Sequence, residues 1–562
     1  MLVALLLPLV ATAVRTVVDP SGAPSGDVAL MEVRVRDVGS QTPLLGSYGR
    51  YGFNHPGPLL FYLFAIPYRL VGSRFLGMEL GTLALGAASI VAIAWVTHRR
   101  GGRALLLWAG LLLGLLVRGV GPAWVANPWE PHGLLLPCAA LLVLAFDAAA
   151  GRAWTLPLVA AVATLLAQAQ ATLLPFAVAL GAFAVVGVLV AARQPDVRSQ
   201  VVRAVGVAAA VTGVLWVPTV VEQLTREPGN LTAMANGLDR PEAALGLADG
   251  ARLVAIQLGL PAPWLGSPTP LAGFGLTVDP AGAPLVPVGA VALVVALAAA
   301  VRRRHRSAWL AASAVVGAVA AALALSRLLG PPFIWIPQWS RVIGFGCWLA
   351  VGWVAGSLVG GTLRGRLRRP AAGVVLAALV VVSIISTGEA VTASREADPL
   401  ADVVGVLTTA AAPALDGLPG PVLITSTASP PAVFGTGTVG MESLVLALER
   451  AGTDTVVERG LADRYGPARA QPELAVAELR LALQRSPVPQ GFRVVATADP
   501  LRTAERAERT ALLRSVGLGP DGRTEDVEPL VDELPAARSV IEGLRRFSDL
   551  PPFVLLLADP PG

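Results

Sequence analysis

Residues 26–62, GDVALMEVRVRDVGSQTPLLGSYGRYGFNHPGPLLFY, directly follow the first apolar segment and hold acids, arginines, tyrosines, a histidine and three prolines. A segment whose only task was to join two membrane helices would need neither the acidic start nor the rigid HPGP turn at residues 55–58. The stretch therefore predicts a site of chemistry beside a bundle of membrane helices. The rest of the chain predicts on which side of the membrane that site lies.

The composition predicts a polytopic membrane protein. Hydrophobic residues make up 54% of the 562 positions, charged residues only 14%, and the mean hydropathy is +0.65. A helix needs about 17 to 25 apolar residues to cross the hydrocarbon of a bilayer. The sequence predicts about eleven such spans, near residues 1–18, 75–97, 104–122, 133–150, 154–171, 173–192, 204–221, 284–301, 308–326, 342–362 and 371–388.

The distribution of arginine predicts the orientation, because basic connections close to membrane ends stay in the cytoplasm. Every second connection is basic, namely those holding Arg99, Arg100 and Arg103, then Arg152, then Arg193, Arg198 and Arg203, then Arg302, Arg303, Arg304 and Arg306, and last Arg364, Arg366, Arg368 and Arg369. We expect a plasma-membrane protein with a cytoplasmic N-terminus. Connections 19–74, 123–132, 222–283 and 327–341 and the C-terminal region then lie outside.

The charge balance argues against a nucleic-acid partner. The formal net charge of +5 and the pI near 9.8 come largely from the inner-face arginines, which suit anionic lipid headgroups. The two cysteines fall in predicted spans, so they indicate neither a disulfide framework nor a metal site.

Beyond residue 388 the apolar runs end, which predicts two domains. These are a transmembrane catalytic domain, 1–388, with the extracytoplasmic loop 19–74, and a soluble extracytoplasmic domain, 389–562. Strands alternating with helices predict an α/β fold there. We expect helices near 399–412, 440–451 and 472–485 and strands at 421–426, 454–458, 492–498 and 553–558. The domain shows no phosphate-binding fingerprint, metal cluster or nucleophile elbow, so we expect docking or recognition from it.

The first half of the outer loop predicts an amphipathic helix lying on the membrane surface. Leu30, Met31, Val35 and Val38 have the spacing of a lipid-facing side. The polar side carries Asp27 and Glu32, which are about 140° apart on a helix, and Arg36, four residues beyond Glu32, can pair with it. The alternative is a solvated loop with an N-capping aspartate.

The second half of the loop predicts an anion site at a helix N-terminus. Pro56 and Pro58 fix φ and Gly57 permits a tight turn, so His55 lies just before a helix that starts with PLLFYL. Unpaired backbone N–H groups and the helix dipole favour a phosphate there. The alternative is that HPGP only shapes a re-entrant turn.

These motifs resemble a known superfamily. An acid just outside the first span, a second acid in the ME pair, and NHPGPLLFYL about thirty residues later are similar to the first extracytoplasmic loop of GT-C polyprenyl-phosphate-sugar glycosyltransferases. Lipid A aminoarabinose transferases and protein O-mannosyltransferases look nearest. In those families the turn usually has K-P-P or H-P-P, so Gly57 is a departure.

The resemblance implies that a sugar moves from a polyprenyl-phosphate donor to an envelope glycan, lipid or protein on the outer membrane face. Asp27 matches the general base, and Glu32 the second acid, which would orient the acceptor or hold Arg36. The leaving phosphate needs fixed cations or donors. The candidates are His55, Arg50, Arg118 and Arg341, with Arg36 and Tyr51 as further substrate contacts.

Two of the phosphate candidates have ordinary structural alternatives. Arg118 lies inside a span, where a charge costs about 2.5–3.5 kcal/mol, so it is a functional candidate unless it snorkels to the headgroups. Arg341 follows Trp335 and Trp339 and could serve as an interfacial anchor.

Two further outer connections supply substrate-binding candidates. Glu130 and His132 flank a Pro after Trp129 and could point into the same cavity as Asp27. They could share a divalent cation with it, but a Glu and a His two residues apart make no zinc site, and the resemblance implies no required cofactor. Glu222, Gln223 and Asn230 could bind a sugar, or could simply cap a helix and form a turn.

Two functions from other classes stay open. A transporter or lipid flippase would also have many spans, yet it should show inverted repeats and interrupted helices. A noncatalytic envelope scaffold would place the function in residues 389–562 alone. The arginine-only, high-GC composition hints at an actinobacterial source, where decaprenyl-phosphate arabinose or mannose would be the donors to try.

Overall fold

The computed structural model describes residues 1–562 except 21, 50, 238–243, 261, 263–276, 285, 360, 394–397, 428–439, 521, 523, 528–529, 531–533, 535, 545–546, 548–551 and 559–562, and it gives no side chains for 361–369, 524 and 525. The chain forms two compact units. The membrane unit comprises Met1–Pro20 and Val35–Arg395, and the C-terminal unit comprises Ser21–Arg34 and Glu396–Gly562. Each unit is described by itself.

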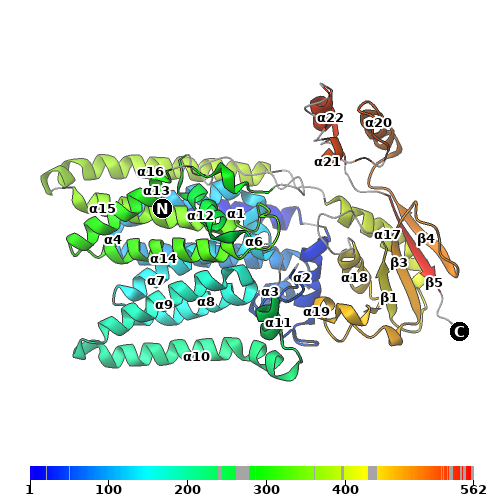
Figure 1. Ribbon diagram of the computed structural model, residues 1–562, viewed down its shortest axis with the longest axis horizontal. Helices are drawn as coiled ribbons and strands as arrows, with labels where there is room; N and C mark the ends of the chain where they lie inside the picture. Colours follow the sequence, from blue (N-terminus) through cyan, green and yellow to red (C-terminus); the bar gives the residue numbers. More distant parts are fainter. Residues whose placement is uncertain are drawn as a thin grey trace. The chain divides into compact units, whose positions relative to one another are not determined.

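The membrane unit is a bundle of long apolar helices that run side by side (Figure 1). Its helices are α1 (Leu2–Val18), α3 (Leu59–Leu70), α4 (Leu76–Val120), α5 (Pro122–Ala126), α6 (Glu130–Gly133), α7 (Leu135–Ala149), α8 (Leu156–Ala169), α9 (Leu174–Ala191), α10 (Pro195–Thr225), α11 (Asn230–Gly237), α12 (Gly246–Leu258), α13 (Val288–Arg302), α14 (Ser307–Ser326), α15 (Arg341–Leu358) and α16 (Gly361–Thr392). Short 3-10 turns precede α8, α9 and α15, at η1 (Ala153–Thr155), η2 (Ala171–Leu173) and η5 (Gln338–Ser340).

Each of the eleven predicted spans overlaps one of these helices over most of its length. The two spans near 75–97 and 104–122 form the two arms of α4, which meet at Gly102, where the backbone leaves the helical region with φ 63°. Within the described residues, seven helices are long and apolar enough to cross a membrane, and α1, α8 and α13 are shorter apolar helices. The chain is thus a multi-pass membrane protein.

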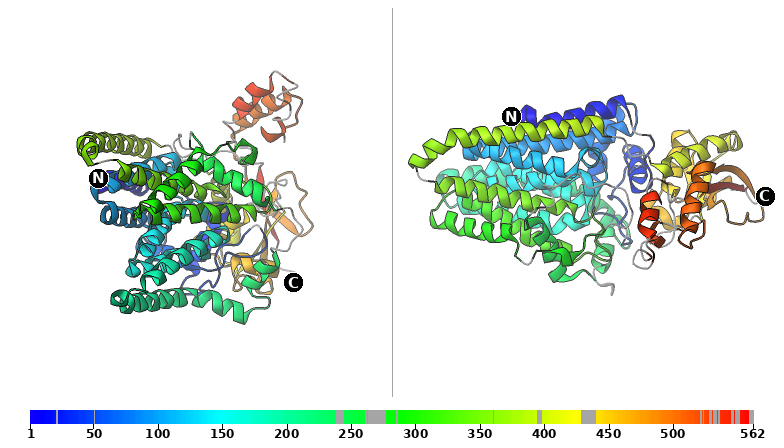
Figure 2. Two further views of the ribbon diagram at one scale, coloured as in Figure 1. Left: turned by 60° about the vertical axis from the view of Figure 1, so that its left-hand side comes forward. Right: turned by 90° about the horizontal axis from the view of Figure 1, so that it is seen from above.

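Burial separates the central helices from the outer ones. α7 lies in the centre of the bundle, where 94% of the most apolar stretch of Glu130–Ala149 is buried. α10 and α16 lie on the outside, where only 17% of the apolar stretch of each is buried, and Figure 1 and the left view of Figure 2 show them at opposite edges of the bundle. Their exposed valines and isoleucines are the expected surface of a helix that faces lipid.

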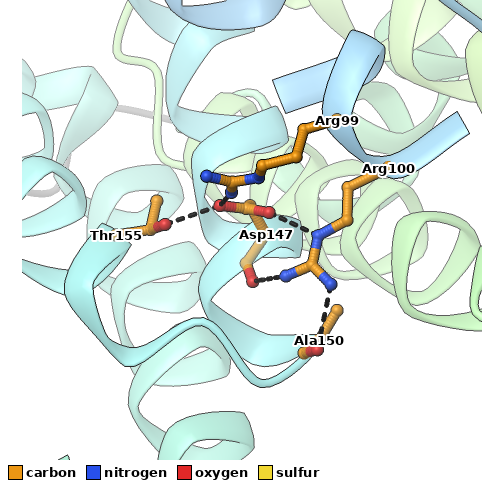
Figure 3. A network of polar contacts seen from close by, with 5 residues as sticks. All are labelled: Arg99, Arg100, Asp147, Ala150 and Thr155. Atoms are coloured by element: carbon orange, nitrogen blue, oxygen red, sulfur yellow. Dashed lines mark hydrogen bonds and ion pairs between the residues drawn. The ribbon is translucent and has the colours of Figure 1, made fainter. Parts of the chain in front are cut away.

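A buried ion-pair network joins the basic turn of α4 to the end of α7 (Figure 3). Asp147 is fully buried, and its carboxylate accepts from Arg99 and Arg100, each at 2.5 Å, and from the Thr155 hydroxyl. Arg100 also donates to the backbone carbonyl of Asp147 at 2.7 Å. Two of the connections that the sequence predicts on the cytoplasmic side are therefore held together by one carboxylate.

The C-terminal unit is built on a five-stranded sheet of order β2-β1-β3-β5-β4. The strands are β1 (Val422–Ser426), β2 (Thr455–Val456), β3 (Ala477–Leu483), β4 (Phe492–Ala498) and β5 (Phe553–Ala558). β1 pairs in parallel with β2 and β3, and β5 pairs antiparallel with β3 and β4. The helices α17 (Pro399–Leu415) and α18 (Met441–Arg450) pack on one face, and α19 (Ala462–Tyr465) follows β2. A separate small core is formed by α20 (Thr503–Arg514), α21 (Thr524–Val527) and α22 (Ala537–Leu544).

One predicted element of this unit is wrong. Residues 477–483 form the central strand β3, whereas we expected a helix near 472–485. Its residues alternate between buried Leu479 and Leu481 and half-buried Glu478 and Arg480, which is the period of a strand. Leu, Ala, Glu and Arg favour helices intrinsically, but pairing with β1 and β5 on both sides overrides that preference.

The first part of the outer loop also differs from the expectation. Residues 26–37 do form a helix, α2 (Gly26–Asp37), but Leu30 does not face lipid. Ala29, Leu30 and Val33 are buried in the core of the C-terminal unit together with residues of α17, α18 and the sheet. Met31 and Val35 are buried as well. The apolar side of α2 packs into a protein core instead of lipid. Burial in a packed core removes these side chains from water as effectively as lipid does.

Candidate active site

In the membrane unit, the HPGP segment closes a tight loop at the start of α3. The chain folds back on itself through backbone hydrogen bonds from Gly46 N–H to the His55 carbonyl (3.0 Å) and from His55 N–H to the Ser47 carbonyl (2.8 Å). α3 begins at Leu59 with Pro58 at its N-cap, as the sequence predicts. The first N–H groups of α3 therefore have no partner from their own helix.

The departure at Gly57 has a steric reason. A Cβ at this position would lie 2.4 Å from Gln168 Oε1 and 2.6 Å from Thr219 Oγ1, far inside normal contact distance. The backbone N–H of Gly57 also donates to the Gln168 carbonyl. The turn thus packs directly against the ends of α8 and α10, and no side chain fits at its centre.

His55 is a half-buried, neutral imidazole at this turn. Its Nδ1 accepts a hydrogen bond from the Ala171 N–H at 3.2 Å, so Nε2 carries the ring proton. Burial lowers the pKa of His55 to about 4. The residue can therefore donate one hydrogen bond to an anion near neutral pH, but it supplies no positive charge.

A narrow pocket, with too little free space in this structure for a water molecule, lies beside this turn. Its lining residues are Gly46, Ser47, Gly57, Pro58, Leu60, Phe61, Glu130 and Ala169. The buried Ser47 Oγ makes no hydrogen bond to any described residue, and the same holds for Gln168 Oε1 and Thr219 Oγ1 beneath the turn. Buried polar atoms left in this state are costly, so they mark the turn and its pocket as a place for a polar ligand.

Glu130 and His132 of α6 are both buried, but only Glu130 lines the pocket. The His132 ring lies between two indoles, with centroid distances of 3.7 Å to Trp124 and 5.1 Å to Trp129. Neither ring nitrogen of His132 bonds to a described residue. The structure brings Glu130 to the HPGP turn, whereas the His132 ring contacts the indoles of Trp124 and Trp129.

Glu222, Gln223 and Asn230 form a turn-capping cluster. Glu222 Oε2 accepts from the Asn230 N–H at 3.0 Å, and Gln223 Oε1 accepts from the Leu231 N–H at 2.8 Å, so both carboxamide and carboxylate cap the start of α11. Asn230 in turn exchanges two hydrogen bonds with the backbone of Asn54. These contacts are those of a helix cap and a turn, the structural alternative to sugar binding. Through Asn54, the cluster also fixes the loop that carries His55.

The two intramembrane arginines are engaged by the protein. Arg118 pairs with Glu389 at 3.1 Å in a second pocket with an empty volume of about 250 Å³, between α1, α4, α5 and α16. Arg341 is buried at the start of α15 and donates to the Gly119 carbonyl at 2.7 Å.

The remaining candidates come from the outer loop. Tyr51 donates to the Leu329 carbonyl at 3.0 Å. Arg50 lies outside the described residues, and Arg36 is half-buried near the end of α2.

In the C-terminal unit, Glu32 has a partner from a distant part of the chain. Its fully buried carboxylate accepts from Arg450 of α18, with distances of 3.0 Å from Nε and 2.5 and 2.6 Å from one terminal nitrogen. A charge-assisted contact of this kind is short and directional. Glu32 thereby fastens α2 to α18, and sequence spacing gave no signal for a partner more than four hundred residues away.

Asp27 lies in the first turn of α2 and is exposed. Protein crowded around its carboxylate nevertheless raises the pKa of Asp27 above the usual range by desolvation, against the opposite effect of the Arg464 cation. An accessible acid with a raised pKa is a better base than an ordinary surface aspartate. Arg464 and Tyr465 of α19, which the sequence did not single out, belong to the same unit and interact electrostatically with Asp27.

The described residues hold no group of three or more His, Cys, Asp or Glu side chains placed to bind a metal ion. Glu130 and His132 are thus not joined by a third acid within that part of the chain.

Comparison with known proteins identifies the fold. No protein-family model matches the sequence, and no curated protein matches it either. Two crystal structures of ArnT from Cupriavidus metallidurans share the architecture. The one bound to undecaprenyl phosphate is 12% identical, with a TM-score of 0.51 over 89% of this chain and 95% of that one. The apo form is 13% identical, with a TM-score of 0.50 over 88% and 94%.

A third structure is more distant. The Archaeoglobus fulgidus oligosaccharyltransferase in complex with Zn and sulfate is 12% identical, with a TM-score of 0.38 over 85% of this chain and 67% of that one, which is too low to support an argument. The likeness to ArnT extends over nearly the full length of both chains. The chain therefore shares the fold of ArnT, and it combines a helical membrane bundle with a small C-terminal sheet unit, as its sequence predicts.

Proposed function

We propose that the protein is a membrane glycosyltransferase that moves a sugar from a polyprenyl-phosphate donor to a cell-envelope acceptor. The observation that carries this proposal is the fold shared with ArnT, whose structure contains bound undecaprenyl phosphate. The exposed Asp27, with its raised pKa, supplies the chemical group that such a reaction needs.

Asp27 acts as the general base. An acceptor hydroxyl oxygen attacks the anomeric carbon of the donor sugar while its proton passes to the Asp27 carboxylate. A new C–O bond forms, the bond from the anomeric carbon to the phosphate oxygen breaks, and the polyprenyl phosphate leaves with the electron pair. Proton removal by a placed side chain contributes about 10²–10⁴-fold to such a step.

The HPGP turn binds the donor phosphate. The unpaired N–H groups at the start of α3 and the Nε2–H of His55 are donors that meet the negative charge developing on the leaving group. Ser47, which lines the adjoining pocket, offers a hydroxyl to the same ligand. Arg118 and Arg341 are already bound to Glu389 and Gly119, so we assign them to holding the bundle rather than to the phosphate.

The arginine distribution supports a reaction on the outer face of the plasma membrane, with the N-terminus in the cytoplasm. Residues 389–562 would then be extracytoplasmic. Alkaline-phosphatase fusions ending in the connections near residues 130 and 152 check this orientation, because only the first should be active in the periplasmic or external space.

The function is tested with purified full-length protein in lipid nanodiscs. A panel of polyprenyl-phosphate sugars, including decaprenyl-phosphate arabinose and mannose, is offered with envelope glycan acceptors, with and without EDTA to determine any need for a divalent cation. Asp27→Asn should lower transfer by about 10²–10⁴-fold because it removes the base while keeping the shape. The matched control is Asp19→Asn, an exposed acid eight residues upstream.

Wild-type activity in Asp27→Asn would contradict the assignment of the base, and the absence of transfer from every donor would contradict the proposed function. Transbilayer movement of the lipid donor in vesicles, unaffected by Asp27→Asn, would favour a flippase instead.

A further inference from the structure

Residues 22–34, which include Asp27 and most of α2, belong to the C-terminal unit. Ala29, Leu30 and Val33 are buried in the core of that unit, and each is no more than 4% exposed. A helix that buries one side in a well-packed core has a fixed axial rotation, because turning it would expose those side chains and leave cavities. The direction in which Asp27 points is therefore set from within this core.

Two polar contacts fix the same helix along its length. Glu32 is bound by Arg450 of α18, and the Arg34 guanidinium donates to the Tyr465 carbonyl of α19 at 3.1 Å. Gly466, which follows directly, has φ 94°, and a Cβ there would lie 2.1 Å from Arg34 NH1. The end of α19 is thus shaped to let the Arg34 side chain approach the backbone.

The end of α19 also brings a charge to Asp27. Arg464 is paired with Glu442 of α18, and both side chains are largely buried. Tyr465 is fully buried in the core, and burial, with the Glu442 and Asp27 carboxylates, raises its pKa, so its hydroxyl stays protonated. Desolvation raises the pKa of Asp27, and the Arg464 cation acts in the opposite direction.

We infer that the C-terminal unit orients the catalytic base: its core and α19 position Asp27 through their contacts with α2, and the Arg464–Glu442 pair tunes the charge near this carboxylate. This inference rests on the proposed function, and it replaces the docking role that the sequence predicts for residues 389–562. Arg464, Glu442 and Tyr465 are positioning residues, since they act through Asp27 and not on the sugar.

Arg464 and Glu442 carry opposite charges, so their substitution should shift the pH profile in opposite directions. Misfolding would lower the activity of a variant without producing such opposite shifts. The pH profile of kcat/KM for the donor is measured with the full-length protein, because its acid limb reports protonation of the base in the free enzyme. Arg464→Gln removes a cation and should move the acid limb to higher pH. Glu442→Gln removes an anion and should move it to lower pH.

Two further variants complete the experiment. Arg464→Lys keeps the charge and should keep the acid limb at its wild-type position. Arg459→Gln is the matched control, because Arg459 precedes the same helix but is 75% exposed and pairs with Glu473 at 3.3 Å. An acid limb that stays in place in both Gln variants, or moves in the same direction in both, would overturn the inference.

A direct titration separates this inference from the proposed function. Solid-state ¹³C NMR of protein labelled at its aspartate carboxyl carbons, with the Asp27 signal assigned by its loss in Asp27→Asn, gives the midpoint without any substrate. The midpoint should rise in Arg464→Gln and fall in Glu442→Gln. If the Asp27 midpoint shifts in this way but the protein transfers no sugar from any donor, the proposed function fails and the positioning role stands.

Discussion

At the scale of single residues, His55 illustrates how burial changes the chemistry of a predicted site residue. The motif placed a histidine at a helix start, and the structure agrees, but the imidazole there is neutral and accepts from the Ala171 N–H. Sequence spacing predicted where the residue lies. It could not predict the protonation state, which depends on packing against the end of α8.

We expect the stability of the protein to depend on pH through His55. Its folded pKa of about 4 lies below the ordinary value of 6.5, so the unfolded chain binds more protons between those values. Stability is therefore fully present above about pH 6.5 and is lost as the pH falls toward 4. Fluorescence-monitored thermal unfolding should show this slope, and His55→Gln should flatten it. An unchanged slope in His55→Gln would assign the acid sensitivity to other groups.

Other residues of the predicted site fall into two classes. Asp27, His55 and Glu130 lie where a substrate group could reach them or beside the pocket at the turn. Glu32, Arg118, Arg341 and the Glu222–Asn230 cluster are occupied by protein partners. These are polar residues in or beside apolar segments. A polar residue in such a place is explained equally well by a partner within the protein and by a substrate. Only the fold reveals the partner, because it comes from a distant part of the chain.

At the scale of helices and strands, hydropathy predicted the membrane helices well. An apolar run of sufficient length has few alternatives to a helix in lipid, since every backbone group must be bonded internally. β3 shows the opposite case. Its residues are good helix formers, and only the neighbouring strands decide its conformation.

The Asp147 network should be essential to the packing of α4 against α7. Asp147→Ala would leave Arg99 and Arg100 without their common acceptor, and removing one member of a buried pair costs about 3–5 kcal/mol. We expect a clearly lower thermal midpoint and less detergent-resistant protein. Asp196→Ala, in the first turn of α10, serves as the control and should change the midpoint little. Equal midpoints for the two variants would show that the network contributes nothing to stability.

At the scale of the whole molecule, the sequence predicts a boundary after residue 388, and the two compact units divide the chain after residue 395. It missed that residues 21–34 belong with the C-terminal unit. A pattern of apolar spacing on one helix predicts that one side is buried, but lipid and a protein core produce the same pattern. The choice between them is a property of the complete fold.

The shared core makes a prediction about the soluble unit. Residues 396–562 produced alone would lack Ala29, Leu30 and Val33, and each buried Leu or Val contributes about 1.5–3 kcal/mol. Fusing residues 22–34 ahead of residue 396 through a flexible linker should raise the thermal midpoint measured by circular dichroism. The same fusion with Leu30→Asp and Val33→Asp is the control and should give no gain. A midpoint independent of the fused segment would show that α2 is dispensable to this core.

The placement of Asp27 in a core made from the last part of the chain also affects biosynthesis. The ribosome completes Asp27 early, but the strands and helices that hold it emerge more than 360 residues later. At about 5–20 residues per second that delay is on the order of half a minute. During translation the reactive carboxylate has no surroundings to give it basicity or direction, so a nascent or prematurely terminated chain should not consume scarce lipid carriers.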